Sequence, residues 1–327
     1  MPAMSRRMIR SVFLAAACVT GSMAAMAEGD GYPQRHVTLI VPFPAGSATD
    51  SVARKLGEGL QKEFGQPFIV ENKVGADGIV AARAAAGAAP DGYTLFITTN
   101  TTQSANPNIY RELPYDPKKD FAPISGLIRI SYMLAARADF PADDFAGFVK
   151  AAKAAAKPIT FGSGNTGSQV SGELLKARLN IDMLNVPYRG SPQALSDLLA
   201  GHIDVFFPDP ASARGLLAES KFKVFAVTGP QRIKTLPAIP TLTELGVADY
   251  NVVAWVAAFA PARTPQPVID RLNGAITAYL KTPEMLAFID QIGSDVMATT
   301  PAELAAFVDD DRRRWAELVE IAKIERK

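Results

Sequence analysis

Short apolar runs alternate with longer amphipathic segments along most of this chain. The first run, Val37–Val41, is typical of a buried strand, and apolar residues recur at helical spacing through residues 51–64. A strand at 67–72, a helix at 78–89 and a strand at 93–98 follow in the same way. This order of strands and helices predicts a parallel sheet with helices on both faces.

A second series of the same kind occupies the middle of the chain, after a proline-rich connection at 106–120. The expected elements after this connection are apolar runs at 121–130 and 131–136, helices at 144–156, 168–179, 192–200 and 210–218, strands at 158–161, 183–186, 203–207 and 223–227, an apolar run at 251–261, and helices at 267–280, 283–292 and 301–321. We therefore predict two α/β lobes. The chain is expected to cross between them near 128–132 and near 251–255, and two crossovers form a hinge.

The turn at residues 42–50 joins the first strand to the first helix. Amide groups at a helix N-terminus lack intrahelical partners, and the helix dipole adds partial positive charge there. Gly46 lets a ligand approach the backbone, and Ser47 and Thr49 add hydroxyl groups. The turn therefore fits an anion, although such hydroxyls are also typical helix caps. Ligands in open α/β sheets bind at the carboxyl ends of strands, so the polar run at 99–103 is expected to lie beside this turn.

A second glycine-rich turn, at residues 162–168, again joins a strand to a helix. Gly162, Gly164 and Gly167 match the G-x-G-x-x-G pattern of dinucleotide-binding turns, and Asp182 follows at the distance of a ribose-binding acid. Asp182, however, precedes its strand instead of ending it. The turn is also rich in hydroxyl and amide side chains, which suits a small anion. A dinucleotide, a small anion and simple helix capping are the three interpretations of this turn.

The first 27 residues have the features of a cleaved secretory signal. Three arginines precede an apolar segment, which ends in the small-residue cleavage site Ala-Met-Ala at 25–27. The ordinary secretory route is favoured over the twin-arginine route. The single cysteine, Cys18, lies in this segment. Its removal leaves a chain without a disulfide, a thiolate nucleophile or a sulfur ligand for a metal.

Composition and charge reduce the number of possible function classes. Removal of the three arginines of residues 1–27 leaves 31 basic against 33 acidic side chains, so the mature chain lacks the basic excess of a nucleic-acid-binding protein. The two histidines, His36 and His202, belong to no metal or nucleophile motif. We therefore predict no catalytic residue, no metal and no cofactor, although a mechanism that uses only carboxylates or serine stays open.

Seven short motifs resemble those of one family, the extracytoplasmic solute receptors of tripartite tricarboxylate transporters, also called Bug or TctC-like proteins. The resemblance runs from about residue 32 to the C-terminus, with all motifs in order. The motifs are VPFPAG at 41–46 with Asp50, VEN at 70–72, PDGYT at 90–94, LPYDP at 113–117, FAPI at 121–124, VPYRGS at 186–191 and FAPA at 259–262.

The resemblance implies a two-lobed periplasmic binding protein of type II, which closes like a Venus flytrap over a small carboxylate. The ligand would be a dicarboxylate, a tricarboxylate or an aromatic acid, passed by a periplasmic monomer to membrane transporter subunits. The implied parts are a signal peptide at 1–27, a first lobe at 28–130 completed by 253–327, and a second lobe at 131–252. A sensory receptor, or a secreted enzyme that binds a nucleotide at 162–167, is the alternative.

The resemblance also implies which residues meet the ligand. Ser47 departs from the family pattern, because a second glycine is usual there. Pro208 and Asp209 stand where the family often has Asp-Asn, which favours a ligand without an amine. The implied ligand-binding residues are Phe43, Ala45, Gly46, Ser47, Thr49, Asp50, Asn100 and Thr101 in the first lobe, Ser163, Gly164, Asn165, Thr166, Gly167 and Ser168 in the second, and Tyr188, Asp209 and Trp255 at the far end.

Overall fold

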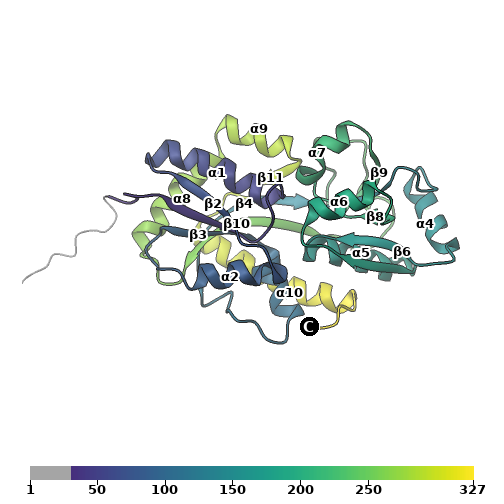
Figure 1. Cartoon of the computed structure of the whole chain (residues 1–327), viewed down its shortest axis with the longest axis horizontal. Coiled ribbons are helices and arrows are strands. Elements are labelled where there is room, and N and C mark those ends of the chain that lie inside the picture. The colour runs from purple at the N-terminus through teal and green to yellow at the C-terminus, as the bar shows by residue number, and fades with distance from the viewer. Residues whose placement is uncertain (1–30) are drawn as a thin grey trace, which may run out of the picture.

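The computed structural model of this protein describes residues 31–327, so the predicted signal peptide lies outside the described residues. Two lobes lie side by side along the long axis of the molecule, and each is built on one sheet with helices packed against it (Figure 1). The two-lobed α/β architecture predicted from the sequence is confirmed. No helix of the described part is long and apolar enough to cross a membrane.

The first lobe is built on a six-stranded sheet. In spatial order its strands are β11 (Ser294–Val296), β4 (Phe121–Ser131), β10 (Val253–Pro261), β3 (Thr94–Thr99), β1 (Val37–Val41) and β2 (Phe68–Asn72). β1 is parallel to both β2 and β3. β10 is antiparallel to β3 and β4, and β11 is antiparallel to β4. The short edge strand β11 was missed by the sequence pattern, because three residues carry too little periodicity.

The second lobe is built on a five-stranded sheet. Its strands, in spatial order, are β7 (Met183–Pro187), β6 (Ile159–Ser163), β8 (Val205–Phe206), β5 (Met133–Arg137) and β9 (Phe222–Val227). β6 is parallel to β7 and β8, whereas β5 is antiparallel to β8 and β9. Both sheets are thus mixed, which corrects the expectation of mainly parallel sheets.

The antiparallel strands result from the two chain crossings. β4 leaves the first lobe and β10 returns to it, so these neighbours run in opposite directions, with Ser131 paired to Val253. Hydrogen bonds from Thr228 N to Tyr132 O (2.9 Å) and from Val252 N to Thr228 O (3.0 Å) join the crossing segments. The two crossings therefore lie side by side. The lobe boundaries at 130/131 and 252/253 stay a prediction, and this pairing is the observation that supports them.

Helices cover the faces of both sheets. Around the first sheet these are α1 (Ala48–Phe64), α2 (Ile79–Ala86), α8 (Gln266–Leu280), α9 (Pro283–Gln291) and α10 (Pro301–Ile321), with the short η1 (Ala76–Gly78), η2 (Thr101–Ala105) and α3 (Asn106–Ile109). Around the second sheet they are α4 (Phe145–Ala154), α5 (Thr166–Leu179), α6 (Ser191–Leu199) and α7 (Pro210–Ala218). The polar run after β3 forms a π-helix, η2, and not an open loop.

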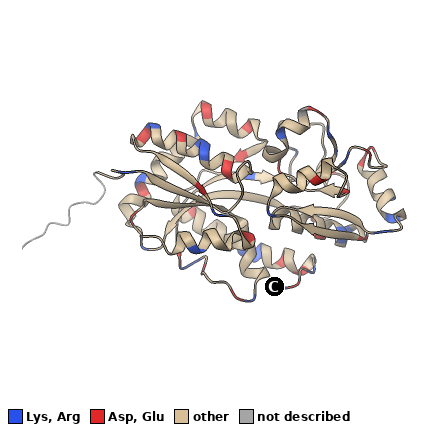
Figure 2. Ribbon diagram, in the orientation of Figure 1, with Lys and Arg blue, Asp and Glu red and all other residues tan. Residues whose placement is uncertain are grey.

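Charged side chains of both signs are spread over the outer helices of the two lobes, and neither sign gathers into one face in this view (Figure 2). On α10, for example, Arg312 pairs with Asp309 and Arg313 pairs with Asp310, in both cases at i,i+3 spacing. Such exposed pairs add little stability, and they leave no uncompensated basic stripe on this helix. The surface is thus in line with the near neutrality of the mature sequence.

Candidate functional site

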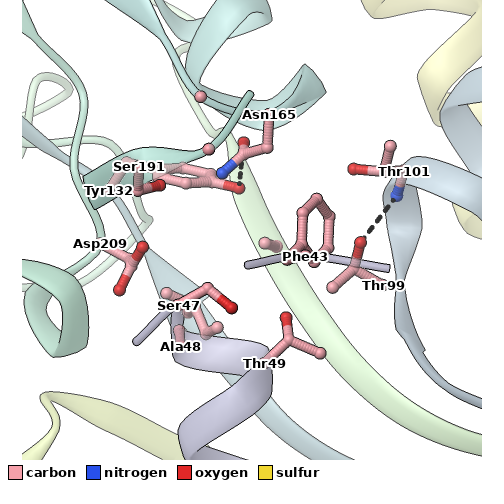
Figure 3. Close-up of a pocket in the computed structure, with 14 residues that line it drawn as sticks. Phe43, Ser47, Ala48, Thr49, Thr99, Thr101, Tyr132, Asn165, Ser191 and Asp209 are labelled. Atoms are coloured by element: carbon pink, nitrogen blue, oxygen red, sulfur yellow. Dashed lines mark hydrogen bonds between the residues drawn. The ribbon is translucent and has the colours of Figure 1, made fainter. Parts of the chain in front are cut away.

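A small cavity lies where the two lobes meet. Figure 3 shows Ser47, Ala48 and Thr49 at the start of α1 on one side of the cavity, with Asn165 and Ser191 opposite. The lining residues are Phe43, Ser47, Ala48, Thr49, Thr99, Thr101, Ile130, Tyr132, Gly164, Asn165, Gly190, Ser191, Asp209 and Ala254. Seven of the predicted ligand-binding residues belong to this set, namely Phe43, Ser47, Thr49, Thr101, Gly164, Asn165 and Asp209.

Four helices begin at this cavity. α1, α5, α6 and α7 are preceded by Ser47, Asn165, Gly190 and Asp209, and each of these N-cap residues is part of the lining. The free amide groups and the dipole of each helix favour negative charge at this end. Among the described residues that line the cavity, none is Lys, Arg or His. The cavity is therefore suited to an anion held by helix N-termini and hydroxyl groups.

Asp50 does not line the cavity but anchors the turn that does. Its carboxylate accepts hydrogen bonds from Gly46 N (3.1 Å), from Arg54 Nε (3.0 Å) and Nη2 (2.9 Å), and from Asn72 Nδ2 (2.9 Å). Asn72 Nδ2 also donates to Phe43 O (2.9 Å). Burial tends to raise the pKa of Asp50, but these hydrogen bonds outweigh it and lower the pKa below its ordinary value. Asp50 is thus an ionised support of the turn.

Ala45 and Gly46 also lie outside the lining. Gly46 has a φ of +82°, and a Cβ at this position would meet no atom within 4 Å. Glycine is therefore required by the backbone conformation, since the left-handed region disfavours other residues. The close approach of a ligand to Gly46, expected from the sequence, is not what this placement offers.

Polar groups in the turn of the second lobe form hydrogen bonds with one another and with Tyr132. Asn165 Oδ1 accepts from Ser168 N (2.9 Å) and from the Tyr132 hydroxyl (3.1 Å). Ser168 Oγ accepts from Gly164 N (3.0 Å) and from Asn165 N (3.2 Å). Of the predicted residues in this turn, Gly164 and Asn165 reach the cavity, whereas Ser163, Thr166, Gly167 and Ser168 are buried behind them.

The three glycines of the G-x-G-x-x-G pattern allow close packing within the second lobe. A Cβ at Gly162 would lie 2.6 Å from Ile203 Cδ1, and a Cβ at Gly164 would lie 2.6 Å from the carbonyl carbon of Gly190. A Cβ at Gly167 would collide with the Tyr132 ring. Because each glycine faces protein atoms, the pattern has a packing role here, and a dinucleotide is not needed to explain it.

The three residues expected at the far end lie in different places. Asp209 lines the cavity and is 4% exposed, and burial raises the pKa of its carboxyl group. Tyr188 lies outside the lining and donates its hydroxyl to Asp197 Oδ2 (2.7 Å). Trp255 is 1% exposed, packs against Phe259 and Phe307, and does not reach the cavity.

Trp255 faces away because side chains alternate along a strand. Its neighbour on β10, Ala254, lines the cavity, whereas Trp255 Nε1 donates to Asp311 Oδ2 (2.7 Å) on α10. Asn100, at the turn between β3 and η2, is also buried outside the cavity, whereas its neighbours Thr99 and Thr101 line it. An apolar run thus predicts a strand, and a polar run after it predicts the end of that strand. Which side chains face the ligand is decided by the tertiary packing.

Replacement of Trp255 by phenylalanine should lower the free energy of unfolding by about 1–3 kcal/mol, because buried Asp311 then loses a hydrogen-bond donor. Ligand affinity should stay the same, since the ring points away from the cavity. Urea unfolding and calorimetric titration check the two expectations. Asp311→Asn, which keeps an acceptor oxygen for Trp255, is the control and should be milder. A loss of affinity at unchanged stability would contradict the placement of Trp255.

Sequence reasoning missed half of the lining residues. Gly190 and Ser191 lie between β7 and α6, and this third strand-to-helix turn carried the same signal as the other two. No local sequence pattern marked Tyr132 as a lining residue, because its position beside the cavity depends on how the chain crosses between the lobes. The other lining residues that were not named as ligand-binding residues are Ala48, Thr99, Ile130 and Ala254, although the polar run at 99–103 was expected to lie beside the first turn.

Turns from the two lobes touch beside the cavity. Gly190, before α6, packs so closely on Pro44, before α1, that a Cβ at 190 would lie 2.7 Å from Pro44 Cγ. At a second contact, a Cβ at Gly293 would lie 2.8 Å from Pro210 Cβ. These contacts describe a closed arrangement of the two lobes, in which the cavity is bounded by both.

Comparison with known families gives one match over most of the chain. A family model described as "Tripartite tricarboxylate transporter family receptor" matches residues 52–324. The matched range includes the turn of the second lobe, the two chain crossings, the helices α5, α6 and α7, and α1 from residue 52 onward.

Solved structures show the same fold at 29–33% sequence identity. A protein of R. palustris solved with adipate is 29% identical, with a TM-score of 0.88 over 90% of this chain and 100% of that chain. The periplasmic binding protein BugD is 33% identical, with a TM-score of 0.85 over 90% of this chain and 100% of BugD. MatC from Rhodopseudomonas palustris, solved with bound malate, is 33% identical, with a TM-score of 0.82 over 88% of this chain and 100% of MatC.

Proposed function

Because the chain belongs to the family of tripartite tricarboxylate transporter receptors, we propose that it captures a small organic carboxylate between its lobes and delivers it to a membrane transporter. The family is one of solute-binding receptors and not of enzymes. Its members with solved structures include a periplasmic binding protein. We infer the same compartment here, reached as a monomer after removal of residues 1–27.

The observation that carries this proposal is the meeting of four helix N-termini at one cavity. One helix comes from the first lobe and three come from the second, so a ligand that contacts both sets must join the lobes. The N-termini of α1, α5 and α6, whose cap residues are uncharged, each contribute about 0.3–2 kcal/mol to the binding of an anion through their dipoles, whereas the N-terminus of α7 is capped by the carboxylate of Asp209. Charge-assisted hydrogen bonds add to this, and they strengthen when closure excludes water. Adipate and malate in the related structures are carboxylates.

Nine of the predicted residues have one of two roles in this proposal. Phe43, Ser47, Thr49, Thr101, Gly164, Asn165 and Asp209 line the cavity and would contact the ligand. Asp50 and Ser168 support the two turns through hydrogen bonds, and we propose them as positioning residues. Tyr132, Gly190 and Ser191 join the proposed contact set.

A thermal-shift screen of the mature chain tests the proposed function. The panel contains monocarboxylates, dicarboxylates, tricarboxylates, aromatic acids, amino acids and NAD, with hits confirmed by calorimetry. We expect one class of carboxylates to raise the unfolding midpoint, because a ligand of the folded state stabilises it by about 2.7 kcal/mol at 100 times its Kd. A shift with NAD and with no carboxylate would overturn the proposal.

A further inference from the structure

Beside the contact of Gly293 with Pro210, the two lobes also meet at a group of charged side chains. Gly293 lies between α9 and β11 of the first lobe, with a φ of +65°. A Cβ at this position would lie 2.8 Å from Pro210 Cβ and 3.1 Å from Ile233 Cγ2. Ile233 belongs to an apolar cluster of the second lobe, together with Met133 and Phe222. The lobes are thus in direct contact here, at the junction of α9 and α7 (Figure 1).

Lys234, next to Ile233, faces two carboxylates of the opposite lobe. Its Nζ lies 3.2 Å from Asp295 Oδ1 and 3.7 Å from Asp290 Oδ1. Asp290 lies on α9 and Asp295 on β11, so both belong to the first lobe, whereas Lys234 follows β9 of the second sheet. Asp295 raises the pKa of the Lys234 ammonium group, and Asp290 adds to this effect. One cation of the second lobe is therefore shared by two anions of the first.

This group of side chains is coupled to the cavity through α7. Asp209 lines the cavity, and Pro210, directly after it, begins α7. A movement of the second lobe that opens the cavity at this helix would also separate α7 from the end of α9. Lys234 belongs to the moving lobe, so its two carboxylate partners would lose their shared cation and repel each other. The ion pairs are therefore expected only in the closed arrangement of the lobes.

We propose that Lys234 is a positioning residue for ligand capture, which holds the lobes closed through its ion pairs with Asp290 and Asp295. The proposal rests on the carboxylate-receptor function above and adds a contact that stabilises closure without touching the ligand. Because a bound ligand leaves only when the lobes open, such a contact slows dissociation. Association is little affected, since the ion pairs form after the ligand has entered between the open lobes.

The expected effect is moderate, because the group is open to solvent. The side chains of Lys234, Asp290 and Asp295 are 70%, 59% and 66% exposed. Solvent screens such pairs, so their loss should weaken binding by about two- to fivefold. The effect should shrink at about 1 M salt, where the Debye length is about 3 Å.

Stopped-flow kinetics and calorimetry of the mature chain test the proposal, with adipate, malate and the other carboxylates of the screening panel as probes. With the probe that binds most tightly, Lys234→Gln should raise the dissociation rate by about two- to fivefold and leave the association rate unchanged. Lys234→Arg keeps the cation and should retain the wild-type rates. A general loss of attraction between the protein and an anion would instead lower the association rate.

Two controls separate the ion pairs from other effects of the lost charge. Lys221 also lies in the second lobe, but its Nζ is 3.8 Å from Glu219 Oε2 of the same lobe. Lys221→Gln should therefore bind like the wild type. In a background in which Asp290 and Asp295 are both replaced by asparagine, Lys234→Gln should have no further effect, because its partners are already neutral.

The inference is overturned if Lys234→Gln dissociates as slowly as the wild type, which would mean that the ion pairs contribute equally whether the lobes are open or closed. It is also overturned if Lys234→Gln lowers only the association rate, or if its effect persists with both aspartates replaced. In these cases the receptor function stands. The absence of binding by any carboxylate of the panel would overturn both.

Discussion

Replacement of Gly190 by alanine is expected to weaken carboxylate binding by about 10- to 100-fold, equivalent to about 1.4–2.7 kcal/mol. The added Cβ would lie 2.7 Å from Pro44 Cγ and 2.9 Å from Pro44 Cδ, and these ring atoms belong to the opposite lobe. Gly190 has a φ of 178°, an extended conformation that alanine adopts readily. The second lobe should therefore fold normally while the closed arrangement is obstructed, and a ligand that needs closure binds less tightly.

Calorimetry measures the affinity, and small-angle scattering with saturating ligand measures the remaining closure. Gly274→Ala on α8 is the matched control, because a Cβ there meets no atom within 4 Å, and it should bind like the wild type. Pro44→Ala in the Gly190→Ala background removes the opposing ring atoms and should restore part of the affinity. If Gly190→Ala binds as the wild type does, the Pro44 contact does not govern closure.

Replacement of Asp50 by alanine is expected to lower the free energy of unfolding by about 2–3 kcal/mol and to weaken ligand binding as well. The change removes the acceptor of Gly46 N and one of the two acceptors of Asn72 Nδ2, so the turn that carries Phe43 and Ser47 loses its anchor. The ion pair between Asp50 and Arg54 accounts for little of the lost stability, because the Arg54 side chain is 52% exposed.

The pH dependence provides a second readout for Asp50. Its pKa is lower in the folded protein than the ordinary value of 3.8. The stability that it contributes is therefore complete above this ordinary value and is lost as the pH falls through the lowered pKa. The difference in stability between the wild type and Asp50→Ala should shrink below about pH 4. Asp50→Asn keeps an acceptor oxygen and should therefore lose less stability than Asp50→Ala. Equal losses of stability in the two variants would contradict the anchoring role of Asp50.

The helices and most strands could be predicted because their signals are local. Apolar spacing located α1, and proline at the first turn located α7 and α10 within a residue or two. The direction of the strands could not be predicted in this way. β10 carries the same apolar pattern in either direction, and its antiparallel pairing follows from the chain crossings. The π-helix η2 was also missed, since a polar run has no helical periodicity.

The sequence alone was sufficient for the family resemblance, the two-lobed α/β architecture and the two glycine-rich turns, because these depend on residue order and periodicity along the chain. The tertiary structure decided which polar side chains serve a ligand. Asp50 and Ser168 bond within their own turns, Trp255 faces the opposite side of the sheet, and Asp209 lies in the cavity. A local pattern shows that a side chain is polar or apolar, whereas its partners come from distant segments that only folding brings together.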